Sequence, residues 1–331
     1  MSDHGESSRP QRVTKPFWTP GTSGLLSVMA VGYAFGLTRF FTGLRTVTHL
    51  DDQFAWGVWK AVNVACGVAL AAGGFTTAAL VDIFGRHKYR PVLRPAILTA
   101  WLGYTMVAVA LFFDIGRYWN IWRPIVHWQG NSVLFEVAMC VMAYLVVLTL
   151  EMAPALLAGA QDRIRENDRG ANLLRRWERP IFAARYWLRH NLPFFIVAGF
   201  VLSCMHHSSL GTLMMIAASK LDPIWLTPLL PLLFLLSAMM VGLPMVILEG
   251  ILAARAFGYR PNLEVLGGLA RKVPWFIAVY AAVRIGDLVA RHAQIDLIER
   301  PERTLLLAVE LVAGLAAPFV LLTRPAVRRS P

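Results

Sequence analysis

The sequence predicts an all-α integral membrane protein, a bundle of about eight transmembrane helices. Only 16% of its 331 residues are charged and 56% are hydrophobic, whereas a soluble domain carries about 25% charged residues. The apolar residues form long runs, such as residues 224–248 without a single charge, and about 20 such residues cross the hydrocarbon layer as a helix. This composition excludes a soluble enzyme, a disulfide-rich secreted domain and a disordered regulator.

Eight apolar segments have the length and hydrophobicity of membrane spans. In chain order they are residues 24–45, 55–80, 92–113, 133–153, 192–216, 224–248, 272–293 and 304–322. Together they form one transmembrane domain, residues 24–323, between an N-terminal tail (1–23) and a C-terminal tail (324–331). The glycine- and alanine-rich run from Cys66 to Gly74 in the second segment predicts a face on which helices pack closely.

Two connections between the spans have a distinctive composition. Within the longest, residues 154–191, arginines alternate with Leu, Trp, Ile, Phe and Tyr. This pattern predicts a cytoplasmic helix that lies in the membrane interface with its arginines toward anionic headgroups. The connection 114–132 instead holds three tryptophans and a tyrosine, which is typical of an interfacial belt or a docking surface.

The distribution of basic residues predicts the orientation. Of 32 Lys and Arg residues, 22 fall in the two tails and in the connections 81–95, 154–191 and 249–272, and seven fall on the opposite side. By the positive-inside rule both termini are cytoplasmic. The net charge of +12 therefore reflects membrane topology better than nucleic-acid binding.

Polar residues within the spans are candidates for function, because ionisable groups are costly in lipid. With the predicted orientation, seven spans place such groups in their outer halves, at Arg39, Lys60, Asn63, Asp114, Glu136, His206, His207, Ser208, Ser209, Arg284, Asp287 and Glu310. Their shared depth predicts one polar cavity that opens toward the periplasm. As alternatives, Arg284 and Asp287 are three residues apart and can pair with each other, and Arg39 and Lys60 can extend to the headgroups.

The histidines and cysteines predict a subunit without haem or metal. A membrane-embedded b-type haem usually needs two histidines that face each other across helices, but His206 and His207 are adjacent and project about 100° apart. The three cysteines, Cys66, Cys140 and Cys204, are far apart in the sequence. They are too few for an iron–sulfur cluster and lack the paired spacing of structural zinc sites.

A set of short motifs in a fixed order resembles a known family. The segment Ser203–Gly211, SCMHHSSLG, is similar to the pattern S-x-M-H-Q-S-S-L-G of the NrfD/polysulfide reductase membrane-subunit family. The resemblance is strongest to its HybB branch, the membrane subunit of periplasm-facing nickel–iron hydrogenases. Further matching stretches are residues 43–59, 66–75, 88–95, 111–122, 135–151 and 284–291.

The resemblance implies a multi-pass inner-membrane subunit of a respiratory oxidoreductase complex that exchanges electrons with quinone, either menaquinone or ubiquinone. The subunit would have no redox centre of its own. Its implied partners are a periplasmic ferredoxin-like iron–sulfur subunit and catalytic subunits, with a nickel–iron hydrogenase as the first expectation. The quinone would bind near the periplasmic face, at the depth where the polar residues gather.

Quinone chemistry needs proton partners at both ring oxygens. We therefore predict His206, Glu136 and Asp287 as acid–base residues. The predicted quinone-binding residues are His206, His207, Ser208, Ser209, Arg39, Asn63, Asp114 and Arg284.

The sequence departs from the family pattern at two positions and leaves other functions open. Asn63 replaces an acid expected in the HybB branch, and His207 replaces the motif glutamine. A sulfur-compound reductase or a multihaem cytochrome enzyme is the alternative catalytic partner. A proton-translocating subunit and a passive membrane anchor are alternatives of other classes. The sequence does not choose the quinone or the direction of electron flow.

Overall fold

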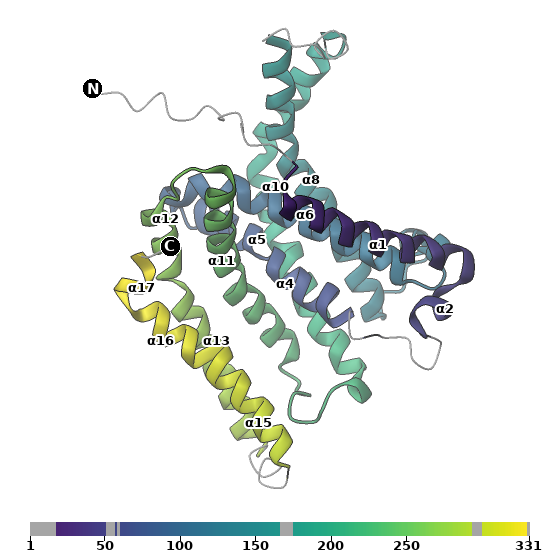
Figure 1. The fold of residues 1–331 in the computed structure, drawn as a ribbon, viewed down its shortest axis with the longest axis vertical. Helices are drawn as coiled ribbons and strands as arrows, with labels where there is room; N and C mark the ends of the chain where they lie inside the picture. The colour runs from purple at the N-terminus through teal and green to yellow at the C-terminus, as the bar shows by residue number, and fades with distance from the viewer. Residues whose placement is uncertain (1–17, 51–56, 58–59, 166–174, 293–299, 330–331) are drawn as a thin grey trace.

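The computed structural model describes residues 18–50, 57, 60–165, 175–292 and 300–329. Within these residues, eight helical segments are long and apolar enough to cross a membrane, which confirms the predicted number (Figure 1). The segments are Pro20–Thr42, Val62–Ile83, His87–Asp114, Val133–Ile164, Glu178–Ile216, Leu230–Phe257, Leu263–Ala290 and Pro301–Thr323. The predicted N-terminal tail up to residue 17 lies outside the described residues.

Several spans are composite. The second span joins η1 (Ala61–Cys66), α4 (Gly67–Ala71), α5 (Gly73–Ala78) and η2 (Ala79–Ile83). The other spans are formed by α1 (Pro20–Thr42), α6 (Arg90–Asp114), α8 (Val133–Arg165), α10 (Glu178–Ile216), α11 (Leu230–Phe257), α12 (Leu263–Ala270) with α13 (Val273–Ala290), and α15 (Pro301–Val309) with η6 (Glu310–Ala316) and α16 (Ala317–Thr323). Here η1, η2 and η6 are π-helical, a geometry that often occurs at functional positions.

The glycine- and alanine-rich run packs as predicted. A Cβ atom on Gly73 would lie 2.7 Å from the carbonyl oxygen of Gly242 on α11, and one on Gly74 would collide with the Cβ of Ala100 on α6. A Cβ on Gly103 of α6 would likewise lie 2.9 Å from that of Ala71. The second span therefore contacts α6 and α11 almost backbone to backbone, as small residues permit in membrane proteins.

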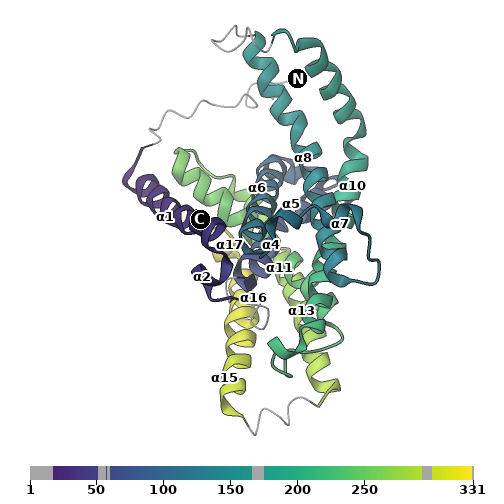
Figure 2. The same ribbon diagram turned by 90° about the vertical axis from the view of Figure 1, so that its right-hand side faces the viewer.

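The fourth and fifth spans differ most from the sequence prediction. The 33-residue α8 and the 39-residue α10 continue as helices into residues 154–165 and 178–191, where we predicted an interfacial connection. The pair projects from the bundle (Figures 1 and 2), and Arg185 on α10 donates a hydrogen bond to Gln161 on α8. A helix of 39 residues is about 58 Å long, nearly twice the thickness of the hydrocarbon layer. The basic segment therefore extends a spanning helix instead of forming a separate one.

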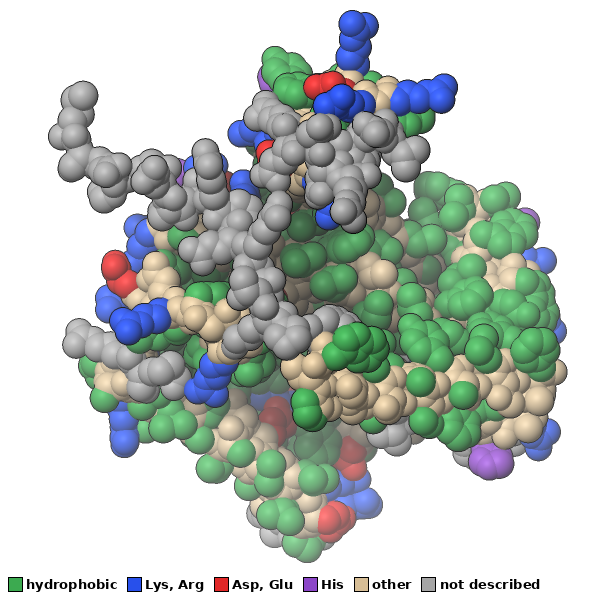
Figure 3. Space-filling model, turned by 45° about the horizontal axis from the view of Figure 1, so that its top comes forward, with side chains coloured by type: hydrophobic (Ala, Val, Ile, Leu, Met, Phe, Trp, Pro, Cys, Tyr) green, Lys and Arg blue, Asp and Glu red, His purple; other side chains and the backbone are tan. Residues whose placement is uncertain are grey.

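The second span, α6, α8, α10 and α11 surround the main core, whose fully buried members include Val68, Tyr104 and Tyr144. The first and last spans are peripheral, since only 6% and 11% of their most apolar windows are buried. The face in Figure 3 is mostly hydrophobic, and its lysines and arginines lie mainly along the margins and on the projecting pair. Lipid or a partner protein must therefore cover most of this surface.

Three basic segments that we assigned to the same side of the membrane do meet. Helix α12 contacts η3 (His87–Tyr89) and α17 (Pro325–Arg329), so the connections 81–95 and 249–272 and the C-terminal tail share one end of the bundle. Such a concentration of basic residues is typical of cytoplasmic ends, and the orientation of this end toward the cytoplasm stays a prediction.

Labelling of single cysteines tests the orientation. In a background without the three native cysteines, Arg117→Cys and Arg176→Cys should react with an impermeant reagent from opposite sides of the membrane. Arg117 precedes η4 (Tyr118–Asn120) at the predicted periplasmic end, and Arg176 lies beside the projecting end of α10; both are exposed. Reaction of both residues from the same side would contradict the predicted topology.

Candidate functional site

The motif Ser203–Gly211 lies on α10 and turns most of its polar side chains into the bundle. Ser203, His206, His207 and Ser209 are each at most 2% exposed. The closing Gly211 lies against the start of α11, where a Cβ atom would come within 2.5 Å of the carbonyl oxygen of Leu230. The motif therefore combines a close helix contact with a cluster of buried polar groups.

His206 is held through one ring nitrogen. Its Nδ1 lies 3.0 Å from the hydroxyl of Tyr104 on α6, and the ring of Tyr104 packs edge-on against Tyr144 of α8, with centroids 4.6 Å apart. Among the described residues, the buried Nε2 of His206 has no hydrogen-bond partner. Because a buried polar atom is costly when it stays unpaired, this nitrogen is a candidate contact for a bound ligand.

His207 has a different environment. Its Nδ1 lies 2.7 Å from the carbonyl oxygen of Ser203, and its Nε2 lies 3.4 Å from the carbonyl oxygen of Val68 on α4. The ring also packs against Phe75, with centroids 5.5 Å apart. A neutral imidazole can donate to only one of the two carbonyl oxygens, whereas an imidazolium can donate to both. His207 therefore joins α10 to the second span and has less freedom than His206 to contact a ligand.

The exposed Glu136 forms a pair with the buried Ser209 next to the histidines. Ser209 donates a 2.6 Å hydrogen bond to the Glu136 carboxylate, in the first turn of α8. Ser209 lies three residues after His206, so it is on the same side of α10, but Glu136 itself is exposed. The structure thus places Glu136 at the rim of the histidine cluster. Ser208, which lies between His207 and Ser209 in the sequence, is half-buried.

Arg284 and Asp287 belong to a second polar group at the end of α13. Asp287 binds Arg291 at 2.8 Å and accepts a 2.6 Å hydrogen bond from Thr227. Arg284 binds Glu310 at 3.1 Å, whereas its closest approach to Asp287 is 3.9 Å. The alternative in which Arg284 and Asp287 pair mainly with each other is therefore minor, since each has a nearer partner.

This second group also joins α13 to the segment before α11. Arg291 donates hydrogen bonds to the carbonyl oxygens of Pro223, Ile224 and Leu226. Trp225 donates to Glu310, at the start of the π-helical η6. We call the set of Arg284, Asp287, Arg291 and Glu310 the arginine–carboxylate network. Its four charged groups already satisfy one another, which is what a structural role requires.

Arg39 belongs to a third location. It is 4% exposed, donates to the carbonyl oxygen of Ile115, and lies 4.6 Å and 4.8 Å from the ring centroids of Phe40 and Tyr118. Asp114, at the end of α6, is half-buried near the same turn. Asn63 is half-buried in η1. The Arg39 guanidinium is therefore held by a carbonyl oxygen and two aromatic rings of the protein, and its extension to the headgroups stays an alternative.

The structure gathers the predicted site residues into separate groups. Among the described residues, no hydrogen bond or ion pair connects the histidines to the arginine–carboxylate network. The single cavity expected from the shared depth of these residues stays a prediction. The partners of these residues were not predicted from the sequence. Tyr104 lies beside His206 and packs against Tyr144, Thr227 binds Asp287 and Trp225 binds Glu310. Aromatic and hydroxyl side chains in apolar spans carry no distinctive sequence signal.

Taken together, the fold and these sites define a multi-pass membrane protein with ionisable groups buried between its spanning helices. The sequence model of the family described as polysulphide reductase, NrfD, matches residues 46–330. The chain therefore belongs to the NrfD family, as its motifs predict.

Several curated proteins are similar to the chain. A protein of Nitratidesulfovibrio vulgaris is 36% identical over 83% of this chain and 68% of its own length. The probable Ni/Fe-hydrogenase 2 b-type cytochrome subunit of Escherichia coli is 35% identical over 76% of this chain and 61% of its own length. The integral membrane subunit of a menaquinone reductase from N. vulgaris is 29% identical over 50% of this chain and 36% of its own length. The chain thus spans about two thirds of the first two relatives.

The name of the Escherichia coli relative raises the question of a haem site. A haem iron with two axial histidines needs imidazoles that face each other. His206 and His207 are adjacent on α10, and both ring nitrogens of His207 lie against backbone carbonyl oxygens. In the described part of the chain, no three His, Cys, Asp or Glu side chains are grouped as metal ligands. The adjacent pair His206–His207 does not fit the two axial positions of one haem, and the absence of haem from this chain stays a prediction.

Proposed function

We propose that this chain is the quinone-reactive membrane subunit of a respiratory oxidoreductase complex in the inner membrane. It would pass electrons between a periplasm-facing iron–sulfur subunit and the quinone pool. The observation that carries the proposal is the buried Nε2 of His206, which has no partner among the described residues in a chain of the NrfD family. A relative named as a menaquinone reductase subunit adds support for quinone as the substrate.

The chemistry assigned to the site is proton exchange with quinone. Reduction of a quinone to a quinol takes up two electrons and two protons, and an adjacent acid–base group lowers the barrier for each proton. If the Tyr104 hydroxyl donates to Nδ1 of His206, Nε2 carries the ring proton and can donate it to a quinone oxygen. Glu136, at the rim, would exchange protons with water. The electrons would come from, or go to, the partner's iron–sulfur centre.

The proposed partners are an iron–sulfur subunit and the catalytic subunits of a nickel–iron hydrogenase. The similarity to the Escherichia coli hydrogenase subunit favours hydrogenase over a sulfur-compound reductase or a multihaem cytochrome enzyme. A covering partner also suits the exposed tryptophans Trp119, Trp122 and Trp128 of the connection 114–132, because exposed aromatic residues are common at protein interfaces.

The purified subunit, reconstituted in detergent or lipid, tests this proposal. It should bind a menaquinone analogue and show no haem band in a reduced-minus-oxidised spectrum, because His206 and His207 are not arranged to hold one iron. His206→Ala should weaken the binding, whereas Ser27→Ala on the peripheral α1 should not. A haem band from this chain alone, or binding that His206→Ala leaves unchanged, would contradict the proposal.

Proton translocation is a second candidate function, supported by a row of polar groups that continues inward from His206. Tyr104 contacts Tyr144, whose buried hydroxyl has no partner among the described residues. Beyond Tyr144, a Cβ atom on Gly199 would lie 3.5 Å from the Tyr144 ring and 2.7 Å from the Glu151 carboxylate. Counting protons moved across proteoliposomes per quinone turned over distinguishes the two functions.

A further inference from the structure

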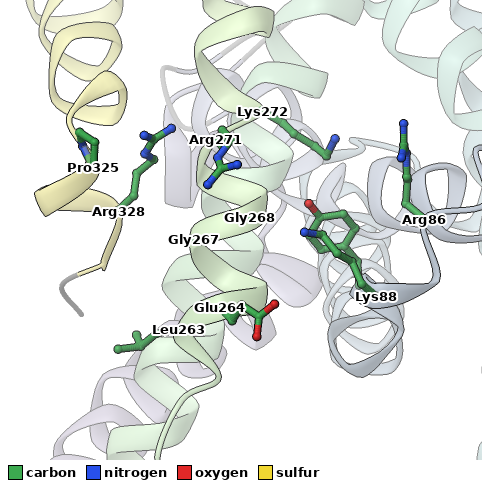
Figure 4. Close-up of a pocket in the computed structure, with 11 residues that line it drawn as sticks. Arg86, Lys88, Leu263, Glu264, Gly267, Gly268, Arg271, Lys272, Pro325 and Arg328 are labelled. Atoms are coloured by element: carbon green, nitrogen blue, oxygen red, sulfur yellow. The ribbon is translucent and has the colours of Figure 1, made fainter.

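A basic cavity lies at the end of the bundle where three cytoplasm-assigned segments meet. Its volume is about 700 Å³, and its lining includes Arg86, Lys88, Glu264, Arg271, Lys272 and Arg328. The residues come from η3 and the turn before it, from α12 and its junction with α13, and from α17 (Figure 4). Residues far apart in the sequence thus direct their charges to one place.

The positive charge of this cavity is uncompensated. Its lining holds five cations and one carboxylate, and none of the five forms an ion pair within the described parts of the chain. The ammonium groups of Lys88 and Lys272 both lie over the ring of the buried Tyr89, 5.1 Å and 5.7 Å from its centroid. Like charges held this close repel one another, so a bound anion would stabilise the arrangement.

The walls of the cavity are closely packed around two glycines of α12. A Cβ atom on Gly267 would lie 2.8 Å from the carbonyl oxygen of Arg328, and one on Gly268 would lie 3.0 Å from the Tyr89 hydroxyl. These glycines allow α17 and η3 to approach α12 from two sides. The arginine and lysine side chains are consequently positioned by packed backbone and not by a loose surface loop.

An apolar groove adjoins the basic cavity. It has a volume of about 250 Å³ and is lined mainly by aliphatic residues of α11, α12 and α13 together with Leu322 and Val327. Leu263, Gly267 and Arg328 line both the groove and the cavity. An occupant that fits both must therefore carry an anionic group next to a hydrocarbon chain.

We propose that the cavity and the groove together bind an anionic phospholipid. The phosphate would lie among Lys88, Arg271, Lys272 and Arg328, and one acyl chain would occupy the groove. Basic pockets between spanning helices on the cytoplasmic side bind the headgroups of such lipids, and the cytoplasmic leaflet supplies them. A soluble phosphate would account for the cations but leaves the adjoining apolar groove unexplained.

Thermal stabilisation of the purified, delipidated protein tests the proposal. Titration with cardiolipin or phosphatidylglycerol should raise the melting temperature, whereas phosphatidylcholine and inorganic phosphate should have little effect. The double variant Arg271→Gln/Lys272→Gln should need about thirtyfold more lipid for half of the shift, because each basic residue near a membrane surface contributes about 1 kcal/mol. The single variant Lys88→Gln, at an exposed position, should show a smaller change in the same direction.

A charge-matched control separates this site from general attraction to anionic lipid. Arg176→Gln/Arg179→Gln removes two exposed charges from the projecting end of α10 and should bind lipid like the original chain. Equal stabilisation by phosphatidylcholine, an equal effect of inorganic phosphate, or equal losses in both double variants would overturn the proposal. Should the first double variant fail to fold, unchanged lipid affinity of Lys88→Gln would overturn it as well.

Discussion

Replacing His206 with alanine is expected to lower quinone-linked turnover of the assembled complex by about 10²–10⁴-fold, the usual contribution of an acid–base group. The reason is the position of Nε2, which is buried without a partner among the described residues, while Tyr104 holds Nδ1. The measurement is quinone-linked activity in membranes, normalised to the amount of assembled complex.

Transfer of electrons from the catalytic partner to a soluble dye is the internal control. This activity should survive in His206→Ala, because a dye bypasses the membrane subunit. Glu136→Gln should also slow quinone turnover, with a smaller effect, since Glu136 lies at the rim and is linked to the motif through Ser209. Unchanged quinone activity in both variants would place the site elsewhere, and a parallel loss of dye activity would contradict a role limited to quinone.

His207→Ala provides a matched comparison on the adjacent residue. Its ring lies against the carbonyl oxygens of Ser203 and Val68, so the substitution removes a link between α10 and the second span. We expect lower thermal stability and a smaller loss of turnover per assembled complex than in His206→Ala. The two histidines, although adjacent, thus have roles that are experimentally separable.

The number and order of the spans were predictable because the membrane imposes a strict length on apolar helices. The close packing at Gly73 and Gly74 was predictable for a similar reason, since small residues have few other uses in a spanning helix. The lengths of α8 and α10 were not predictable from the sequence. A polar segment rich in arginine and aromatic residues continues a helix as readily as it forms an interfacial one, and tertiary packing decides between the two.

For the candidate site, the sequence predicts how deep each residue lies along its span but not toward which neighbour its helix turns the side chain. Position along the span placed His206 and Asp287 at similar depth, yet the helices turn these residues into different groups. Glu136 illustrates the limit most clearly, because hydropathy assigned it to a span and only packing shows that it is exposed. The same holds for Tyr104 and Tyr144, whose importance comes from their contacts with His206 and with each other.

The second prediction with a large expected effect concerns Asp287 in the arginine–carboxylate network. The contacts of Asp287 there favour a structural role over the acid–base role predicted for it from the sequence. The Asp287 side chain is 5% exposed and faces Arg291 at 2.8 Å. Asp287→Asn would remove the buried carboxylate that Arg291 binds, although the Arg291 side chain itself is 26% exposed. Loss of one partner of a fully buried pair typically costs about 3–5 kcal/mol, so we expect a cost up to that range and unfolding at a lower temperature.

Asp222→Asn is the matched control, because Asp222 forms a 2.8 Å ion pair with Arg303 but its side chain is 31% exposed. Its loss should cost less than the loss of the Asp287 carboxylate, because the Asp222 side chain is half-buried whereas that of Asp287 is 5% exposed. Thermal unfolding of both variants in detergent, together with quinone turnover per assembled complex, separates stability from chemistry. If Asp287 is structural, stability falls while turnover per assembled complex changes little. Normal stability of Asp287→Asn with turnover reduced about 10²-fold or more would instead support the acid–base role of Asp287. Loss of a carboxylate that is needed only for packing cannot slow the reaction of a complex that is already assembled.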